Sequence, residues 1–328
     1  MNRIPSKVIV GIVAVIGVGI VAGWLMKGEL SARYAAYRLG SASDDAARLD
    51  RARELVALAP GSNATITNQM ASGTVEIRKA LLDAIAELPA DDPRFGPAAF
   101  ASLDCLDQLD NDSLDSALLL IPKLVLEPGR ADRARAIMES AFKGSRAMKV
   151  AACRTAIQDG VEMAAAVVPL LADEDAFVRR AAVLAVGPTG PGTQVVSEED
   201  LFKLLGDPDG DVRTLTAAAL GTRGLNDRQI AFGRKLMHRD ATVRMSLLID
   251  LKFADDSIKD VGPWLARLAK DTDPAVRAGA ARVAYECRIS SRDWLADMAE
   301  HDPDGLVRQV AGHYRQKADD VRPVGFER

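Results

Sequence analysis

The chain has 328 residues, of which 48% are hydrophobic but only 5% aromatic, so its apolar content is carried mainly by Ala, Val, Leu and Ile. Such small aliphatic side chains allow helices to approach closely and are typical of packed helical hairpins. The 42 basic and 46 acidic side chains give a formal net charge of −4, which argues against a dedicated nucleic-acid-binding protein, because such proteins need a basic surface.

The amino-terminal end carries one long apolar segment. After a short tail at residues 1–7, the segment 8–26 contains 19 residues without a charged side chain, bounded by Lys7 and Lys27. As a helix it is about 28 Å long, close to the thickness of the hydrocarbon layer of a membrane. It predicts a single transmembrane anchor. A cleaved signal peptide is the alternative, since Val21-Ala22-Gly23 offers small residues at a cleavage site.

The predicted anchor indicates where the protein is located and how two copies can associate. We expect a single-pass protein of a bacterial inner membrane, with the large part after residue 27 exported. That part holds 39 basic and all 46 acidic residues, a formal charge of −7. Gly19 and Gly23 form a GxxxG motif, through which two anchors can pack as a homodimer.

Residues 27–160 are predicted to form an amino-terminal cap followed by degenerate helical repeats. A helix is expected to end at Gly40 and another to begin after Ser41. Thr74-Val-Glu-Ile-Arg78 and Ser145-Arg-Ala-Met-Lys149 each place a helix-capping residue before an aliphatic-basic pair. Between them, around residues 111–118, this pattern is almost lost.

Two blocks of opposite charge lie in this part of the chain, an acidic one at 91–127 and a basic one at 130–154. They pair with each other between neighbouring repeats, or they form patches for a charged partner. The basic block supplies candidate partner-binding residues: Arg130, Arg133, Arg135, Lys143 and Arg146.

Residues 161–317 contain a regular repeat. Five times an Asp is followed, three and four residues later, by Val and Arg, and the Val positions are separated by 34, 31, 33 and 31 residues. This period is typical of stacked helical pairs. The Asp and Arg residues of the five repeats are Asp175 and Arg179, Asp209 and Arg213, Asp240 and Arg244, Asp273 and Arg277, and Asp304 and Arg308.

The repeated residues are predicted to be structural. The Asp lies where a helix begins and caps its first turn, which stabilises a helix by about 1 kcal/mol. A second Asp precedes it by two residues in four of the repeats, at 173, 207, 271 and 302, whereas His238 takes this position in the fifth. These carboxylates are expected to pair with the Arg of a neighbouring repeat.

On these residues the chain resembles the HEAT-repeat family, and more closely the HEAT-like repeats of phycobilisome lyase subunits. The resemblance implies an all-α fold, an α-solenoid of stacked helical hairpins with about eight repeats, following the one transmembrane helix. It implies a surface that binds partners and no shared catalytic residues. Residues 318–328 are expected to form a flexible tail.

No catalytic, cofactor-binding or metal-binding residue is predicted. A calcium loop starting at Asp207 would need Gly at 212 and Glu at 218, where the chain has Val and Ala. The cysteines Cys105, Cys153 and Cys287 lie far apart and are expected to be buried free thiols. Trp264 and Trp294 occupy equivalent places 30 residues apart, either in the core or as an aromatic ledge for a partner.

Two functions are compatible with these features. The first is a membrane-anchored HEAT-repeat scaffold, not an enzyme, that mediates protein–protein interaction and binds no nucleic acid. The alternative is an enzyme or enzyme accessory on the same frame, lyase-like or nucleic-acid-processing. Residues 91–154, where the repeat pattern breaks, and the loop at 188–198 are the predicted sources of specificity.

Overall fold

The structure is a computed structural model that describes residues 28–190, 194–254, 260–289 and 293–320. The part of the chain it describes is helical, and no β-strand occurs in it. This confirms the predicted all-α class. Residue contacts divide the chain into an amino-terminal unit, Met1–Val186, and a carboxy-terminal unit, Gly187–Arg328.

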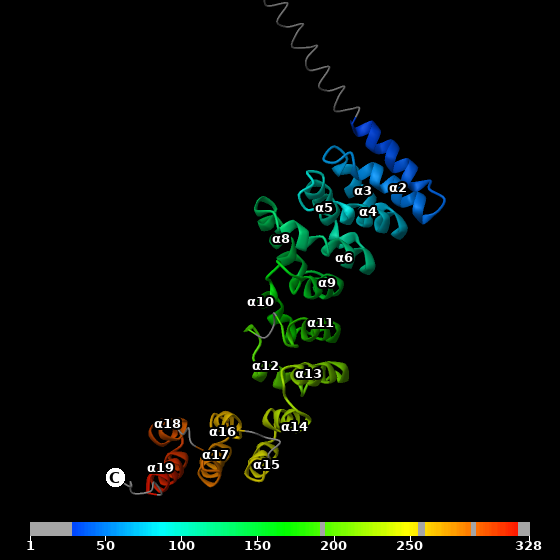
Figure 1. Ribbon diagram of the computed structural model, residues 1–328. Helices are drawn as coiled ribbons and strands as arrows, with labels where there is room; N and C mark the ends of the chain where they lie inside the picture. The colour runs from blue at the N-terminus through cyan, green and yellow to red at the C-terminus, as the bar shows by residue number, and fades with distance from the viewer. Residues whose placement is uncertain (1–27, 191–193, 255–259, 290–292, 321–328) are drawn as a thin grey trace, which may run out of the picture. The chain divides into compact units, whose positions relative to one another are not determined.

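The amino-terminal unit begins with helical residues 28–40. Its further helices are α2 (Asp45–Val56), α3 (Asn63–Ser72), α4 (Val75–Glu87), α5 (Phe95–Leu103), η1 (Leu106–Gln108), α6 (Asn111–Leu118), α7 (Ile121–Val125), α8 (Pro128–Ala141), α9 (Arg146–Ala156), α10 (Ala164–Val167), η2 (Val168–Ala172) and α11 (Ala176–Val186). Within this unit α4 packs against both α2 and α6, and α9 against both α6 and α11 (Figure 1).

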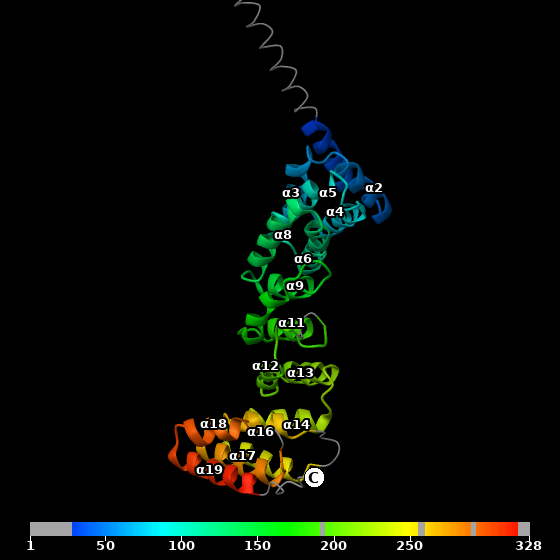
Figure 2. The same cartoon turned by 60° about the vertical axis from the view of Figure 1, so that its left-hand side comes forward.

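The carboxy-terminal unit contains α12 (Glu198–Leu204), α13 (Gly210–Thr222), α14 (Asp227–Leu236), α15 (Ala241–Lys252), α16 (Gly262–Leu268), α17 (Pro274–Glu286), α18 (Asp293–His301) and α19 (Gly305–Asp320). Here α14, α16 and α18 lie in one row, and α15, α17 and α19 lie in another beside it (Figures 1 and 2). The helix α17 contacts both α15 and α19.

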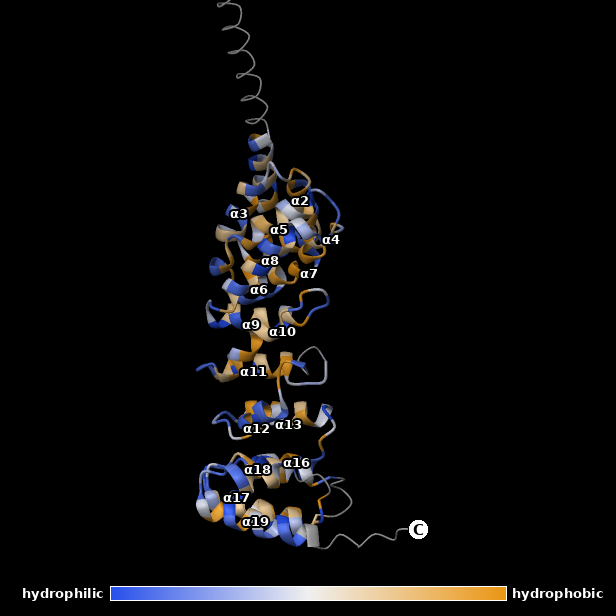
Figure 3. Cartoon of the chain, turned by 90° about the vertical axis from the view of Figure 1, so that its left-hand side faces the viewer, coloured by the Kyte–Doolittle hydropathy of each residue, from blue (hydrophilic) through white to orange (hydrophobic). Residues whose placement is uncertain are grey.

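The core of each unit is built from aliphatic side chains on one face of each helix. Hydrophobic and hydrophilic residues alternate along the helical ribbons (Figure 3), the pattern of helices that bury one side. In the amino-terminal unit Leu81 and Ile85 of α4 are fully buried, as are Leu265 and Leu268 of α16 in the other unit. Each such side chain contributes about 1.5–3 kcal/mol by leaving water.

Most helix starts of the repeats are fixed by a capping side chain. The carboxylate of Asp209 accepts hydrogen bonds from the amides of Asp211 and Val212, and Asp273 does the same for α17. Thr74 and Ser145 cap α4 and α9 in the same way. Asp110 caps α6 by accepting from the amide of Ser113, in the region where the sequence pattern is almost lost.

The predicted localisation needs correction. No helix within the described ranges is long and apolar enough to cross a membrane, so a single-pass membrane protein is not supported. The segment 8–26, on which that prediction depended, lies outside the described residues, as do Gly19, Gly23 and the tail at 321–328.

Candidate functional site

The repeated Arg closes the loop in front of its own helix. In each of the five repeats its Nη1 atom donates to two successive main-chain carbonyl groups, five and six residues earlier. For Arg277 these are the carbonyls of Asp271 and Thr272, at 2.8 and 3.2 Å. The side chain therefore gives hydrogen-bond partners to loop carbonyl groups that lie outside both flanking helices.

The same guanidinium also reaches the next repeat. Nε and Nη2 of Arg277 donate to the two carboxylate oxygens of Asp302, at 2.8 and 2.9 Å. Arg244 makes the same two-pronged contact with Asp271, at 2.7 and 2.9 Å. Planar pairs of this kind are the strongest and most directional ion pairs. We call this arrangement, an Arg bound to its own loop and to the following Asp, the clasp.

The clasp formed by Arg277 and Asp302 is buried, and it shifts the pKa values of both side chains. Arg277 and Asp302 are only 8% and 7% exposed. The hydrogen bond with Arg277 lowers the pKa of Asp302, although burial opposes this, and the same bond raises the pKa of Arg277. Asp302 also accepts from the amide of Asp304 at 2.9 Å. The repeated charged residues are thus used to hold helices together.

One repeat departs from the clasp. His238 takes the place of the second Asp, and its Nδ1 accepts from the amide of Asp240 at 3.1 Å. The hydrogen bond to His238 thus replaces the one that an Asp makes at this position, but the imidazole supplies no carboxylate for Arg213. Arg213 is exposed and, among the described residues, binds only the carbonyls of Asp207 and Pro208.

The clasp recurs in the amino-terminal unit with altered residues. Arg78 donates to the carbonyls of Met70 and Ala71, at 2.7 and 3.0 Å, and to Asp110 at 2.9 Å. Lys149 donates to Asp173 at 2.7 Å. Sequence analysis missed the role of Asp110 because its helix lacks the Val-Arg pair.

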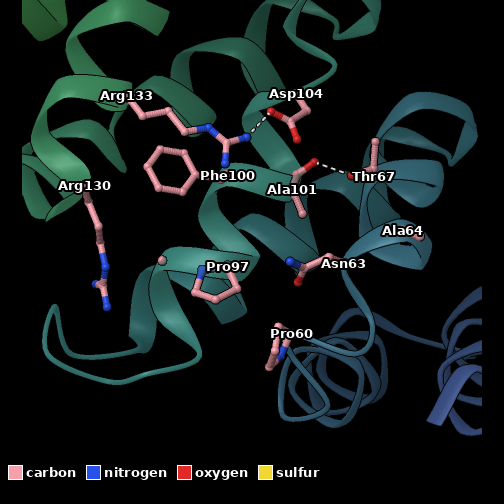
Figure 4. A pocket seen from close by; sticks show the side chains of 11 residues that line it. Pro60, Asn63, Ala64, Thr67, Pro97, Phe100, Ala101, Asp104, Arg130 and Arg133 are labelled. Atoms are coloured by element: carbon pink, nitrogen blue, oxygen red, sulfur yellow. Dashed lines mark hydrogen bonds and ion pairs between the residues drawn. The ribbon is translucent and has the colours of Figure 1, made fainter. Parts of the chain in front are cut away.

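A separate feature of the amino-terminal unit is an open hollow of about 590 Å³, bordered by α3, α5 and α8 (Figure 4). We call it the Arg130 hollow. Its lining residues are Pro60, Asn63, Ala64, Thr67, Gly96, Pro97, Phe100, Ala101, Asp104, Arg130 and Arg133. It therefore brings together two of the predicted partner-binding residues, Arg130 and Arg133.

Arg133 forms one wall of the hollow. Its guanidinium carbon lies 4.2 Å from the centre of the Phe100 ring, and Nη2 donates to Asp104 at 2.7 Å. Stacking on an aromatic face and pairing with a carboxylate both hold a guanidinium in place. Arg133 and Asp104 neutralise each other at the rim.

Arg130 is arranged differently. It is half-buried, and its Nη1 donates to the carbonyl of Ala90 at 2.8 Å, but it has no carboxylate partner among the described residues. A Cβ atom at position 96 would lie 2.6 Å from its Nε, so only Gly96 allows this close approach. The hollow thus contains one guanidinium whose charge is not compensated.

Asn63 adds an unused acceptor. Its Oδ1 atom is buried and has no hydrogen-bond partner in the described part of the chain, and the same holds for the hydroxyl of Ser62 beside it. Leaving such a group unpaired costs about 1–3 kcal/mol. In Figure 4 Asn63 lies across Pro97 from Arg130.

The other predicted basic residues lie outside the hollow. Arg146 pairs with Asp175, and its guanidinium carbon lies 5.1 Å from the centre of the Phe177 ring. Arg135 is exposed and only 3.7 Å from Asp132, and Lys143 is exposed. Between the two charge blocks, Arg133 pairs with Asp104 and Arg154 with Asp115.

The two tryptophans differ in burial. Trp264 is 4% exposed and its ring centre lies 5.5 Å from that of Phe202 and 5.6 Å from that of Phe232. It is a core residue, and its burial excludes it from an accessible aromatic ledge. Trp294 is half-buried.

An exposed apolar row on α15 was not anticipated. Met245, Ile249 and Phe253 are 37%, 62% and 70% exposed. Met245 and Ile249 are four residues apart and share one face of α15, and Phe253, the residue that ends the helix, follows four residues later. Leu247, Leu248 and Leu251 are buried on another side. The spacing was visible in the sequence, but it does not reveal which of two apolar faces is covered.

The three cysteines are free thiols. Cys105 and Cys153 are buried free thiols, and burial raises the pKa of Cys153 to about 12. Within the described ranges no three His, Cys, Asp or Glu side chains are grouped to hold a metal ion.

Comparison with known proteins gives no further identification: no protein-family model matches the chain, and no curated protein matches it.

Proposed function

We propose that the chain is a HEAT-like α-solenoid scaffold that binds a segment of a protein partner in the Arg130 hollow. The solenoid is supported by the clasp, which recurs at the period of the sequence repeat and joins one helical hairpin to the next. Solenoids of this kind present extended surfaces to partners.

The observation that carries the binding function is the composition of the hollow. It combines apolar walls from Pro97, Ala64 and Ala101 with the uncompensated guanidinium of Arg130. Binding sites are typically apolar concavities with a few polar groups that fix orientation. Arg residues and aromatic rings are also enriched among the residues that dominate binding energy.

The function can be tested by selecting peptides from a displayed random library on the immobilised full-length chain. Affinities of the enriched peptides are then compared for Arg130→Gln and for Arg135→Gln. Arg135 is a matched control, because it lies on the same helix but outside the hollow. We expect Arg130→Gln to lower affinity roughly 10-fold or more and Arg135→Gln to leave it unchanged. Equal binding by both variants would place the interaction elsewhere and refute the proposal. Thermal unfolding of both variants checks that each remains folded.

A further inference from the structure

The polar groups of the Arg130 hollow define the chemistry of the segment it accepts. We infer that the hollow binds an extended peptide through an internal Asp or Glu side chain, whose carboxylate pairs with Arg130. This inference rests on the proposed function and specifies its partner.

Charge is the first argument. Among the lining residues only Asp104, Arg130 and Arg133 are charged, and Arg133 already pairs with Asp104. The hollow therefore carries a net charge of about +1, located on Arg130. Among the described residues this guanidinium donates only from Nη1, to the carbonyl of Ala90, so further N–H groups remain for a carboxylate. A half-buried charge of this kind gains most from an anionic partner that also excludes water.

The apolar walls explain why the carboxylate belongs to a side chain within the segment. Pro97 and Ala64 line the hollow together with Arg130, and the hollow is open to solvent. A main chain that lies on these apolar walls can therefore direct an acidic side chain toward Arg130. The residue next to it in the peptide is expected to be apolar, to match Pro60, Pro97 and Ala64.

The test uses fluorescence anisotropy with the full-length chain and labelled peptides enriched by the library, acetylated and amidated at their ends. Each peptide is compared with a version in which its acidic residue is replaced by Gln or Asn. We expect the replacement to weaken binding roughly 10- to 100-fold. In Arg130→Gln this difference should disappear, and in Arg135→Gln it should persist. A third peptide, with the acidic residue replaced but a free terminal carboxylate, should bind as weakly as the neutral one.

Three results would overturn the inference: enriched peptides without an acidic residue, discrimination that survives in Arg130→Gln, or rescue of binding by the free terminal carboxylate. If peptides bind in an Arg130-dependent way but ignore the acidic residue, the scaffold function stands and only this inference fails. If no peptide depends on Arg130, both fail.

Discussion

A single guanidinium in the clasp serves two helical hairpins. Arg277 satisfies two carbonyl groups of its own loop and pairs with Asp302 of the following repeat. Both partners are almost fully buried. A buried ion pair adds less stability than its distances suggest, because desolvation opposes it, but removing one partner leaves the other charge unpaired.

The first prediction compares two Arg residues that occupy the same repeat position. Arg277→Gln leaves Asp302 buried without its partner and should lower the free energy of unfolding by about 3–5 kcal/mol. Arg213→Gln removes only carbonyl contacts of an exposed side chain and should cost about 1 kcal/mol. Urea denaturation monitored by circular dichroism measures both. Similar costs for the two variants would show that the carboxylate contributes little.

A second prediction concerns acid. Burial opposes ionisation of Asp110, but hydrogen bonds from the amide and hydroxyl of Ser113 and from Arg78 lower its pKa to about 2. The pKa in the folded chain is below the unfolded value of about 3.9. The resulting stability is therefore present above about pH 4 and lost as the pH falls toward 2.

The measurement for this prediction is urea denaturation between pH 2 and 6. We expect Asp110→Asn to cost about 1–2 kcal/mol at pH 6 and almost nothing near pH 2. Asn remains a good helix cap, so the comparison isolates the charge. Asp132→Asn, at an exposed position of α8, serves as the control. A cost that does not change with pH would contradict the account.

At the scale of the element, α15 differs from an ordinary amphipathic helix. It buries Leu247, Leu248 and Leu251 and exposes the row Met245, Ile249 and Phe253 on another side. Exposed apolar rows of this kind mark interaction surfaces on soluble proteins. The row lies in the carboxy-terminal unit and is a surface separate from the Arg130 hollow.

The third prediction distinguishes the two faces of α15. Ile249→Ser should change the free energy of unfolding by about 0.5 kcal/mol or less, because the side chain is already in water. Leu248→Ala should cost about 2–5 kcal/mol, because it opens a cavity. Both values come from urea denaturation of the full chain. A large loss in Ile249→Ser would show that the exposed row is covered.

The helix starts could be predicted because capping depends on a few neighbouring residues. Thr74, Ser145 and the repeated Asp residues all lie where the sequence placed them, at the first turn of a helix. The Arg130 hollow could not be predicted. It depends on the approach of Arg130 to Gly96, 34 positions apart, and on an Asn63 oxygen whose isolation is visible only after folding.

For the whole molecule, the sequence correctly predicted an all-helical chain because the apolar spacing is helical throughout. The localisation prediction was less successful. It rested on hydropathy alone, and the helices that the structure describes give it no support. The number of repeats and the solenoid itself remain predictions. The recurrence of the clasp supports them.

The fourth prediction concerns a substitution at His238, the position where the clasp lacks its Asp. His238→Asp supplies the missing carboxylate and should raise the free energy of unfolding by about 1 kcal/mol, the value of a partly exposed two-pronged pair. The gain should vanish in an Arg213→Gln background, which a double-mutant cycle measures. A gain that persists without Arg213 would come from the turn and not from the clasp.

The interruption at His238 has a mechanical consequence for the carboxy-terminal unit. Beyond it, α17 contacts both α15 and α19, and two-pronged ion pairs, Arg244 with Asp271 and Arg277 with Asp302, join these repeats. By contrast, α13 lacks such extensive contact with α15. We therefore expect the joint between the repeats of Asp209 and Asp240 to be more compliant than the two joints that follow it. Under bending or tension, the three hairpins after it are expected to move as one stiff block, with strain concentrated at His238.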